Sequence, residues 1–147
     1  MNTELMFSSK TNEWETPKEL FDQLDDEFRF TLDPCASNEN YKCDYYFTKE
    51  KDGLKESWEG ETVFCNPPYG RSIKEWVKKA YKESRNKNTV VVMLIPARTD
   101  TTYFHDYIYG RSEIRFIKGR LLFIKNGKNP NKSERAPFPS MIVIFKG

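Results

Sequence analysis

The sequence is poor in residues that bind transition metals. Its 147 residues contain one histidine, His105, and three cysteines, Cys35, Cys43 and Cys65. The cysteines lack CxxC spacing, and with a single histidine they form no recognisable zinc-binding set. Their odd number argues against a disulfide framework, so we expect reduced thiols and no metal cofactor.

Long apolar runs are lacking as well. No stretch approaches the ~18 apolar residues of a membrane-spanning helix, and the N-terminus shows no signal peptide. The 24 basic and 22 acidic residues nearly balance, so the composition does not require a partner of opposite charge. We therefore expect a cytoplasmic protein with no membrane contact. A flexible N-terminus is expected at residues 1–13, and one folded domain at residues 14–147.

Basic residues are nevertheless concentrated near the end of the chain. Residues 111–135 contain eight basic residues and two acidic ones. Such a segment could follow the phosphates of a nucleic acid or form a solvated loop, and charge alone favours neither. Aromatic residues are also abundant, at 15%. We expect most of these rings in the core and a few of them stacked on bases.

The spacing of apolar residues predicts alternating strands and helices. Thr16 and Pro17 are typical of a helix start, with Thr16 as the N-cap. The apolar run 89–96 is typical of a central strand that is buried on both faces. The other expected elements are a short strand ending at Asp33, a strand at 62–65, helices at 73–81 and 100–110, and closing strands at 113–119, 120–125 and 139–145. This alternation indicates an α/β sheet, mostly parallel, with antiparallel pairing at one edge.

Three of the expected strands end in polar turns that contain proline. These turns are 33–37 (Asp-Pro-Cys-Ala-Ser), 66–69 (Asn-Pro-Pro-Tyr) and 96–100 (Pro-Ala-Arg-Thr-Asp). Ligands of open α/β sheets bind outside the carboxyl ends of the strands. If the three strands are parallel, we expect the turns to lie along one edge of the sheet and to form the functional site.

The turn 66–69 has the groups needed to bind an aromatic amine. Its prolines make it stiff and leave backbone carbonyl oxygens available as hydrogen-bond acceptors. The Asn66 amide oxygen is a second acceptor, and the Tyr69 ring can stack on a flat ring system. Two fixed acceptors can take both hydrogens of an amino group, which favours a more tetrahedral nitrogen whose lone pair points at an electrophile. This would be catalysis by position and electrostatics, without a metal or a covalent intermediate.

This turn matches the [D/N/S]PP[Y/F] motif of S-adenosylmethionine-dependent amino methyltransferases. The chain also resembles the phage- and prophage-encoded Dam-type DNA N6-adenine methyltransferases. The segments that carry this resemblance cover most of residues 14–145 in the family's order, namely "WETPKELFDQLDDEFRFTLDPCAS", "DGL", "FCNPPYG", "IPARTDTTYF", "IKGRLLF" and "APFPS". The resemblance implies a single-domain, Rossmann-like methyltransferase sheet with helices on both faces. It also implies methyl transfer from S-adenosylmethionine to adenine N6 in double-stranded DNA, with the adenine flipped out of the helix.

The resemblance also implies roles for individual residues. The catalytic residues would be Asn66, Pro67, Pro68 and Tyr69. The residues that contact the cofactor would be Trp14, Thr16, Pro17, Asp33, Pro34, Cys35, Ala36, Ser37 and Asp52. Apart from the resemblance, the basic segment, the turn 96–100 and the proline-flanked Phe138 offer candidates for DNA contact, namely Arg98, Arg120, Lys125, Lys128, Arg135 and Phe138. The sequence departs from the wider methyltransferase pattern because its first strand is not followed by GxG, so the backbone contacts of the cofactor are not indicated.

Some of these residues have alternative interpretations. Asp52 could contact the cofactor or belong to a plain Asp-Gly turn. Arg98 could contact a phosphate or base edge, or pair with Asp100. Phe138 could form the second face of a stacking clamp opposite Tyr69, or it could be a core anchor at the start of the last strand.

The function has alternatives too. The same chemistry would serve a methyltransferase that acts on RNA or on protein glutamine, and the fold would also serve a nucleic-acid-binding module without turnover. The chain has no room for a separate target-recognition domain. We therefore expect loops 98–104 and 125–139 to select the target, with a short or relaxed recognition sequence.

Overall fold

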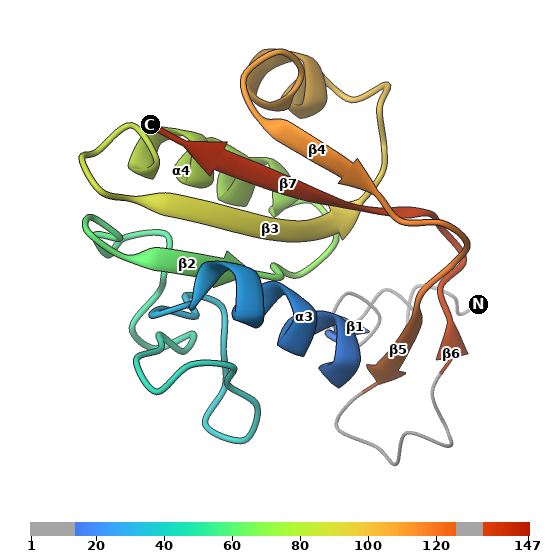
Figure 1. Cartoon of the computed structure of the whole chain (residues 1–147), viewed down its shortest axis with the longest axis horizontal. Helices are drawn as coiled ribbons and strands as arrows, with labels where there is room; N and C mark the ends of the chain where they lie inside the picture. The colour runs from blue at the N-terminus through green and yellow to red at the C-terminus, as the bar shows by residue number, and fades with distance from the viewer. Residues whose placement is uncertain (1–13, 126–133) are drawn as a thin grey trace.

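Four strands form the main sheet, in the order β2-β3-β7-β4 (Figure 1). The structure is a computed structural model that describes residues 14–125 and 134–147. The four strands are β2 (Thr62–Cys65), β3 (Val90–Pro96), β4 (Glu113–Phe116) and β7 (Ser140–Lys146). β2 and β3 are parallel, whereas β7 is antiparallel to both β3 and β4. β4 therefore has the same direction as β2 and β3.

Two short segments extend this sheet beyond β2. Leu32 forms a parallel bridge with Val63, and Asp33 forms a parallel bridge with Tyr46. The segment 31–33 thus shares its direction with β2, β3 and β4. The predicted α/β sheet of mostly parallel strands, with antiparallel pairing towards one edge, is confirmed. The reversed strand is β7, which lies between β3 and β4, one position in from the edge.

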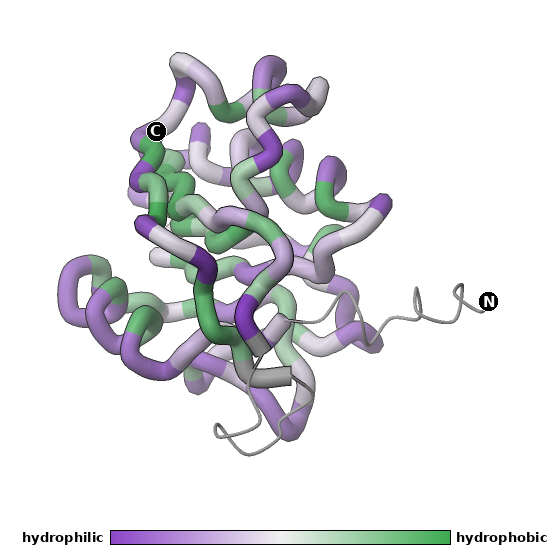
Figure 2. Tube along the Cα trace, turned by 90° about the vertical axis from the view of Figure 1, so that its right-hand side faces the viewer, coloured by the Kyte–Doolittle hydropathy of each residue, from purple (hydrophilic) through white to green (hydrophobic). Residues whose placement is uncertain are grey.

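Helices cover both faces of the main sheet, as predicted (Figure 1). On one face lies α3 (Lys18–Phe28), where Phe21 packs edge-on against Phe64 of β2 with ring centroids 5.1 Å apart. On the other face lies α4 (Ile73–Glu83), whose buried residues are Ile73, Trp76, Val77 and Ala80. Figure 2 shows hydrophobic residues concentrated along the strands and hydrophilic ones on the outer turns of the helices. The short helix expected at 100–110 is present as a π-helical turn, η1 (Phe104–Ile108).

The predicted start of the first helix is wrong in one detail. α3 begins at Lys18 with Pro17 at the N-cap position, and no side chain caps it. Instead of capping the helix, the Thr16 hydroxyl accepts a hydrogen bond from the Asn66 amide nitrogen, at 2.9 Å. The hydroxyl of the expected N-cap thus connects the helix start to the turn 66–69.

A second, smaller sheet lies beyond the end of the main one (Figure 1). It has the order β1-β5-β6 and consists of β1 (Trp14–Glu15), β5 (Leu122–Lys125) and β6 (Glu134–Arg135). Both of its pairings are antiparallel. The strand predicted at 120–125 therefore exists, but it pairs outside the main sheet. Gly119, with a φ of 75°, lies between β4 and β5 and supports the change of chain direction that glycine tolerates best.

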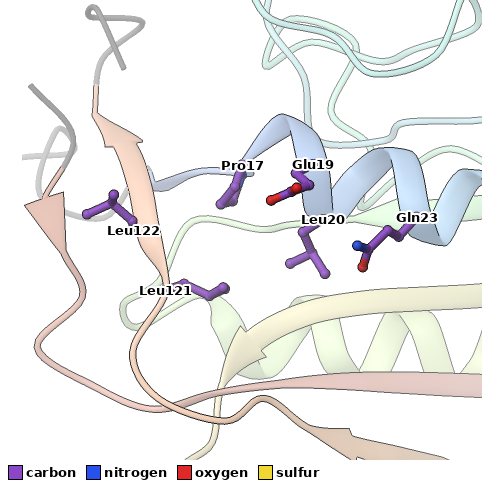
Figure 3. Close-up of a pocket in the computed structure, with 6 residues that line it drawn as sticks. All are labelled: Pro17, Glu19, Leu20, Gln23, Leu121 and Leu122. Atoms are coloured by element: carbon purple, nitrogen blue, oxygen red, sulfur yellow. The ribbon is translucent and has the colours of Figure 1, made fainter. Parts of the chain in front are cut away.

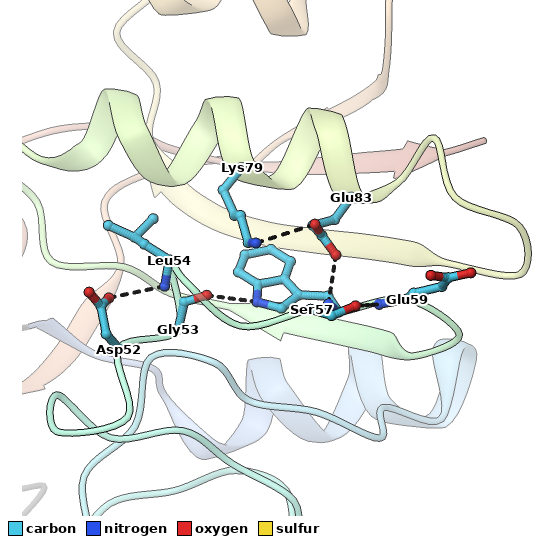
Figure 4. Close-up of polar contacts among 8 residues, drawn as sticks. Asp52, Gly53, Leu54, Ser57, Glu59, Lys79 and Glu83 are labelled. Carbon is cyan, nitrogen blue, oxygen red and sulfur yellow. Dashed lines mark hydrogen bonds and ion pairs between the residues drawn. The ribbon is translucent and has the colours of Figure 1, made fainter.

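Trp58 anchors the irregular segment 48–60 to α4, near Gly53, Lys79 and Glu83 (labelled in Figure 4). Its indole N–H donates to the Gly53 carbonyl oxygen at 3.0 Å, and its backbone N–H donates to Glu83 Oε1 at 2.6 Å. The Lys79 ammonium lies 5.5 Å from the Trp58 ring centroid and also pairs with Glu83 at 3.2 Å. Trp58 is completely buried. The Trp58 side chain and its partners thus help to hold a long segment without regular structure.

Candidate active site

The segment 31–33, β2 and β3 all end at one edge of the main sheet, which we call the carboxyl edge. Because β7 is antiparallel to β3, its first residue, Ser140, is opposite Pro96, the last residue of β3. The segment 136–139 reaches the same edge, where the Pro139 carbonyl oxygen accepts the Ala97 N–H at 2.9 Å. The parallel strands therefore place the three proline-containing turns along one edge, as predicted.

Asn66 is half-buried at this edge and is held at both ends of its amide. The amide nitrogen donates to the Trp14 carbonyl oxygen at 2.6 Å and to Thr16 Oγ1 at 2.9 Å. The amide oxygen accepts the Tyr69 hydroxyl at 2.6 Å. A carbonyl oxygen can accept two hydrogen bonds, so Asn66 Oδ1 retains capacity for one more. The Pro67 carbonyl oxygen receives no backbone hydrogen bond from the residues that the structure describes.

Tyr69 points into the protein rather than into solvent. Its side chain is 6% exposed, and its hydroxyl lies 2.6 Å from Asn66 Oδ1 and 3.1 Å from the Leu94 carbonyl oxygen. Burial raises the pKa of the Tyr69 phenol well above its ordinary value, so the hydroxyl stays protonated and acts as a donor. In this arrangement little of the ring is accessible, and its stacking on a base stays a prediction.

Tyr69 belongs to an aromatic cluster, defined here as Trp14, Tyr69, Phe123 and Phe138. The Phe138 ring lies 5.6 Å from Tyr69 and 5.3 Å from Trp14, at angles of 77° and 84°. Edge-to-face contacts of this kind are typical of packed aromatic cores. Rings at nearly right angles leave no parallel slot for a base between Tyr69 and Phe138. Phe138 is a core anchor here, and its role in a clamp stays a prediction.

Arg98 is exposed beside this cluster. Its guanidinium carbon lies 5.9 Å from the Phe138 ring centroid, which is a cation–π distance. The alternative pairing with Asp100 is not formed, and Arg98 makes no ion pair with any described residue. A guanidinium beside the aromatic cluster therefore remains available to a phosphate or a base edge.

The turn 33–37 is organised around the carboxylate of Asp33. Asp33 Oδ1 accepts the Cys35 N–H at 3.1 Å, and Oδ2 accepts the Lys42 N–H at 2.9 Å. Burial raises the pKa of Asp33 to about 6, and the two backbone donors offset only part of that effect. Further along the turn, the Ala36 N–H donates to the Phe47 carbonyl oxygen at 3.0 Å. The exposed Ser37 hydroxyl accepts the Asn40 N–H at 3.0 Å.

Gly53 packs directly against this turn. A Cβ atom at Gly53 would lie 2.1 Å from the carbonyl oxygen of the buried Pro34, so a side chain cannot be accommodated without movement. Asp52, the residue before it, has a φ of 61° and accepts the Leu54 N–H at 3.1 Å (Figure 4). The Asp52 carboxylate therefore stabilises an Asp-Gly turn in this structure, and its contact with a cofactor stays a prediction.

A hollow of about 340 Å³ lies at the start of α3, facing the chain that leads into β5 (Figure 3). It is lined by Pro17, Glu19, Leu20, Gln23, Leu121 and Leu122. The volume falls within the ~300–1,000 Å³ that is typical of small-molecule sites. Leucines combined with a carboxylate and an amide suit a ligand that has both apolar and polar parts. Of the predicted cofactor residues, Pro17 alone is among the described residues that line this hollow, so a role of the hollow in holding S-adenosylmethionine stays a prediction.

The five basic residues predicted to contact DNA fall into two groups. Arg98, Arg120 and Arg135 are exposed, and Arg135 Nη1 donates to the Arg120 carbonyl oxygen at 3.1 Å. Lys128 lies outside the described residues, and of Lys125 the structure describes only the backbone, in β5. Arg115, also in the basic segment, is neutralised by Glu27 and Glu113, each at 2.7 Å. The basic segment is thus partly paired within the protein.

Sequence reasoning missed several residues of the site. Phe123 is completely buried in the aromatic cluster, although its segment was expected to be a strand of the main sheet. The Trp14 and Leu94 carbonyl oxygens, which contact Asn66 and Tyr69, carry no side-chain signal that a sequence could show. Ser140 is 1% exposed, and its hydroxyl has no hydrogen-bond partner within the described part of the chain. Such a hydroxyl at the carboxyl edge is a polar group that a ligand could satisfy.

Neither a membrane-spanning helix nor a metal-binding cluster is found in the described part of the chain. Among residues 14–125 and 134–147, no helix has the length and apolar character needed to cross a membrane. Over the same two ranges, no group of three or more histidine, cysteine or acidic side chains is arranged to hold a metal ion.

The chain is similar to phage enzymes that modify DNA. A family model described as "DNA N-6-adenine-methyltransferase (Dam)" matches residues 4–147. The DNA N-6-adenine-methyltransferase of Haemophilus phage HP1 (strain HP1c1) is 29% identical over 135 residues, which are 90% of this chain and 78% of that protein. The protein of the same description from Escherichia phage T1 is 33% identical over 129 residues, which are 86% of this chain but 53% of the phage T1 protein. The chain belongs to the DNA N-6-adenine-methyltransferase (Dam) family.

Proposed function

We propose that this protein transfers a methyl group from S-adenosylmethionine to the N6 amino group of adenine in double-stranded DNA, and that the turn 66–69 holds that amino group. The orientation of Asn66 carries the proposal. Its amide nitrogen is occupied by Trp14 and Thr16, so its oxygen is left as an acceptor in the same turn as the Pro67 carbonyl. The family and the names of both phage relatives support the reaction and the substrate.

Two acceptors explain the reactivity of the amine. Asn66 Oδ1 and the Pro67 carbonyl oxygen would each accept one N6 hydrogen. The nitrogen lone pair would then be less delocalised into the adenine ring and more nucleophilic. When bound, S-adenosylmethionine supplies an electrophilic methyl group. The chain's contribution is to fix the position of the amine, to polarise its hydrogens and to exclude water from the carboxyl edge.

The cofactor would be held by residues on either side of this turn. The turn 33–37 has a compact backbone fixed by Asp33, and the hollow at the start of α3 includes Pro17. The turn 33–37 lies at the carboxyl edge. The hollow adjoins Thr16, which contacts Asn66. We propose that the other predicted cofactor residues, Cys35 and Asp52 among them, support the backbone of the turn 33–37 rather than contact the cofactor directly.

The adenine must leave the base stack to reach Asn66, which costs a few kcal/mol. Arg98 is suited to hold the DNA near the turn because it is exposed and not ion-paired with described residues. Arg120 and Arg135 would contact phosphates further along the duplex. Because the relatives are phage proteins, we propose that the substrate is DNA inside an infected bacterial cell.

The decisive experiment offers several substrates to the purified protein with S-adenosylmethionine labelled in its methyl group. Duplex DNA, structured RNA and a glutamine-containing protein are incubated in parallel, and the modified nucleoside or residue is identified by mass spectrometry. We expect N6-methyladenine in the DNA sample alone. Labelling confined to RNA or to protein glutamine would refute the proposal, and nothing in the structure favours either over DNA.

Asn66→Ala tests the catalytic assignment. We expect methyl transfer to fall at least 100-fold, because one of the two acceptors for the amine is lost. Binding to duplex DNA, measured by fluorescence anisotropy, should remain within threefold of the wild type. Retention of methyl transfer by the variant would show that the turn is not the catalytic site.

A further inference from the structure

We infer that Thr16 and the Trp14 carbonyl group hold the Asn66 amide in its reactive orientation, and that Thr16 is a positioning residue of the methyl-transfer site. The inference rests on the proposed function and deepens it. By family resemblance, Thr16 belongs to the cofactor-side segment. In the structure, however, its hydroxyl is 2.9 Å from Asn66 Nδ2, and the residue is only 2% exposed.

The chemistry of the two partners settles which end of the amide is which. A backbone carbonyl oxygen can only accept, so the atom 2.6 Å from the Trp14 oxygen must be the amide nitrogen. The opposite atom, which faces the Tyr69 hydroxyl at 2.6 Å, must then be the oxygen. The orientation follows from the donors and acceptors present, without reference to the substrate.

Methyl transfer needs this orientation because only the oxygen can accept an N6 hydrogen. A rotation of the amide by half a turn would direct the NH₂ group at the substrate amine, donor against donor. It would also bring the amide oxygen to about 2.6 Å from the Trp14 oxygen, acceptor against acceptor. The Thr16 hydroxyl would have to change from acceptor to donor to keep its contact with the amide. The Trp14 carbonyl therefore selects the reactive orientation, whereas the Thr16 hydroxyl, which can accept or donate, fixes the position of the amide. Each hydrogen bond is expected to contribute about tenfold to the population of the reactive arrangement.

The same contact explains why asparagine stands at this position. An aspartate would place a carboxylate oxygen against the Trp14 carbonyl oxygen, where the asparagine has an N–H donor. The wider amino methyltransferase motif accepts aspartate, asparagine or serine here. In this chain we expect aspartate to be disfavoured, because its β1 segment presents an acceptor to residue 66.

Thr16→Val and Thr16→Ser form the central test. Valine has nearly the shape of threonine without the hydroxyl, and serine retains the hydroxyl. We expect Thr16→Val to lower kcat about tenfold at saturating S-adenosylmethionine, while the KM and Kd for S-adenosylmethionine stay unchanged. Thr16→Ser should retain most of the wild-type rate. Thr89→Val is the matched control. Thr89 is also 2% exposed, and its hydroxyl accepts the Gly60 N–H at 2.8 Å, away from the turn 66–69.

A second measurement does not depend on activity. The side-chain amide signals of Asn66 can be identified in a ¹⁵N–¹H NMR spectrum by their loss in Asn66→Ala. Two engaged amide hydrogens should exchange slowly with solvent in the wild type, and one should exchange about tenfold faster in Thr16→Val. Thr16→Ser and Thr89→Val should match the wild type.

Several outcomes would overturn the inference. One is a Thr16→Val variant with weaker cofactor binding but unchanged kcat, which would make Thr16 a cofactor contact. Another is a Thr16→Ser variant as slow as Thr16→Val. A third is an Asn66 side-chain amide whose hydrogen-exchange rate is the same in Thr16→Val and in the wild type. If Thr16→Val does not fold, Asn66→Asp decides, because activity near that of the wild type would contradict the role of the Trp14 carbonyl. If the wild type methylates no DNA, the proposed function fails, and the exchange measurement still decides whether Thr16 holds the Asn66 amide.

Discussion

Asp33 has a carboxylate that is almost completely buried and accepts two backbone N–H groups. Burial raises its pKa from the ordinary value near 3.8 to about 6 in the folded protein. The folded state therefore binds a proton at Asp33 more tightly than the unfolded state does. Ionisation of this group costs stability as the pH rises from about 4 to about 6, on the order of 3 kcal/mol in total.

The raised pKa of Asp33 predicts that the stability of the wild type and that of Asp33→Asn depend differently on pH. As the pH falls from 7 to 4, the free energy of unfolding of the wild type should rise relative to that of the variant, because only the wild type gains a proton at this site. Urea titrations at several pH values measure this difference. A difference that stays constant from pH 4 to pH 7 would show that Asp33 has an ordinary pKa.

Tyr69 allows its hydroxyl and its ring to be tested separately. In Tyr69→Phe the packing of the ring is retained, and Asn66 is still held by Trp14 and Thr16. We expect kcat to change less than threefold and stability to fall by about 1 kcal/mol, the value of one hydrogen bond. Tyr69→Ala should lose about 3–5 kcal/mol by opening a cavity in the aromatic cluster. Thermal unfolding and steady-state rates check both, and a Tyr69→Phe variant as inactive as Asn66→Ala would assign a catalytic role to the hydroxyl.

At the scale of the elements, two irregular turns support one another. Gly53 lies against the Pro34 carbonyl oxygen, and Trp58 in turn fixes Gly53 and α4. The shape of the turn 33–37 therefore depends on a segment that follows it by about twenty residues. The contact is steric, since Gly53 does not have a left-handed backbone conformation.

Gly53→Ala should displace the turn 33–37, because the new methyl group would lie 2.1 Å from the Pro34 oxygen. We expect a loss of about 1–3 kcal/mol in stability, together with weaker binding of S-adenosylmethionine in a calorimetric titration. Gly60→Ala is the control. Gly60 has a φ of 81°, and no atom of the described residues lies within 4 Å of the position that its Cβ would take. Alanine should therefore strain the backbone there without affecting cofactor binding, and equal cofactor affinity in both variants would contradict the support role of Gly53.

The elements also show which parts of the fold a sequence can predict. Apolar runs and prolines located the strands at 62–65 and 89–96 and the turn 66–69, because burial and proline geometry act locally. The contact between Thr16 and Asn66 joins residues 50 positions apart, and a single sequence carries no signal for such a pairing. The strands of two residues, β1 and β6, are too short to show an alternating pattern. A capping motif was predicted at Thr16 because the local pattern is the same whether the hydroxyl caps a helix or contacts Asn66.

At the scale of the whole molecule, we propose that the exposed arginines hold the DNA. Arg98→Ala should weaken duplex binding several-fold and reduce the slope of log Kd against log salt by about one. Arg115→Ala removes a cation that is already paired with Glu27 and Glu113, so its slope should match the wild type. Fluorescence anisotropy at several salt concentrations measures both. Equal slopes for Arg98→Ala and the wild type would remove Arg98 from the DNA interface.

The selection of target sites is also a property of the whole chain. Loops 98–104 and 125–139 are the expected readers of sequence, and residues 126–133 of the second lie outside the described residues. We expect a short or relaxed recognition sequence. Methylation-aware sequencing of DNA from cells that express the protein checks this expectation, and a long, strictly defined target sequence would contradict it.

The position of β7 has a consequence for the order of folding. β3 and β4 are adjacent to β7 and not to each other, so the sheet cannot close until the last strand inserts between them. That strand follows Phe138 directly, and its insertion brings Phe138 against Tyr69 and Trp14. Pairing over such sequence distances is a slow step in the folding of a sheet. We therefore expect the aromatic cluster around the turn 66–69 to be completed late in folding, so that a partly folded chain contains this turn without the packing around it.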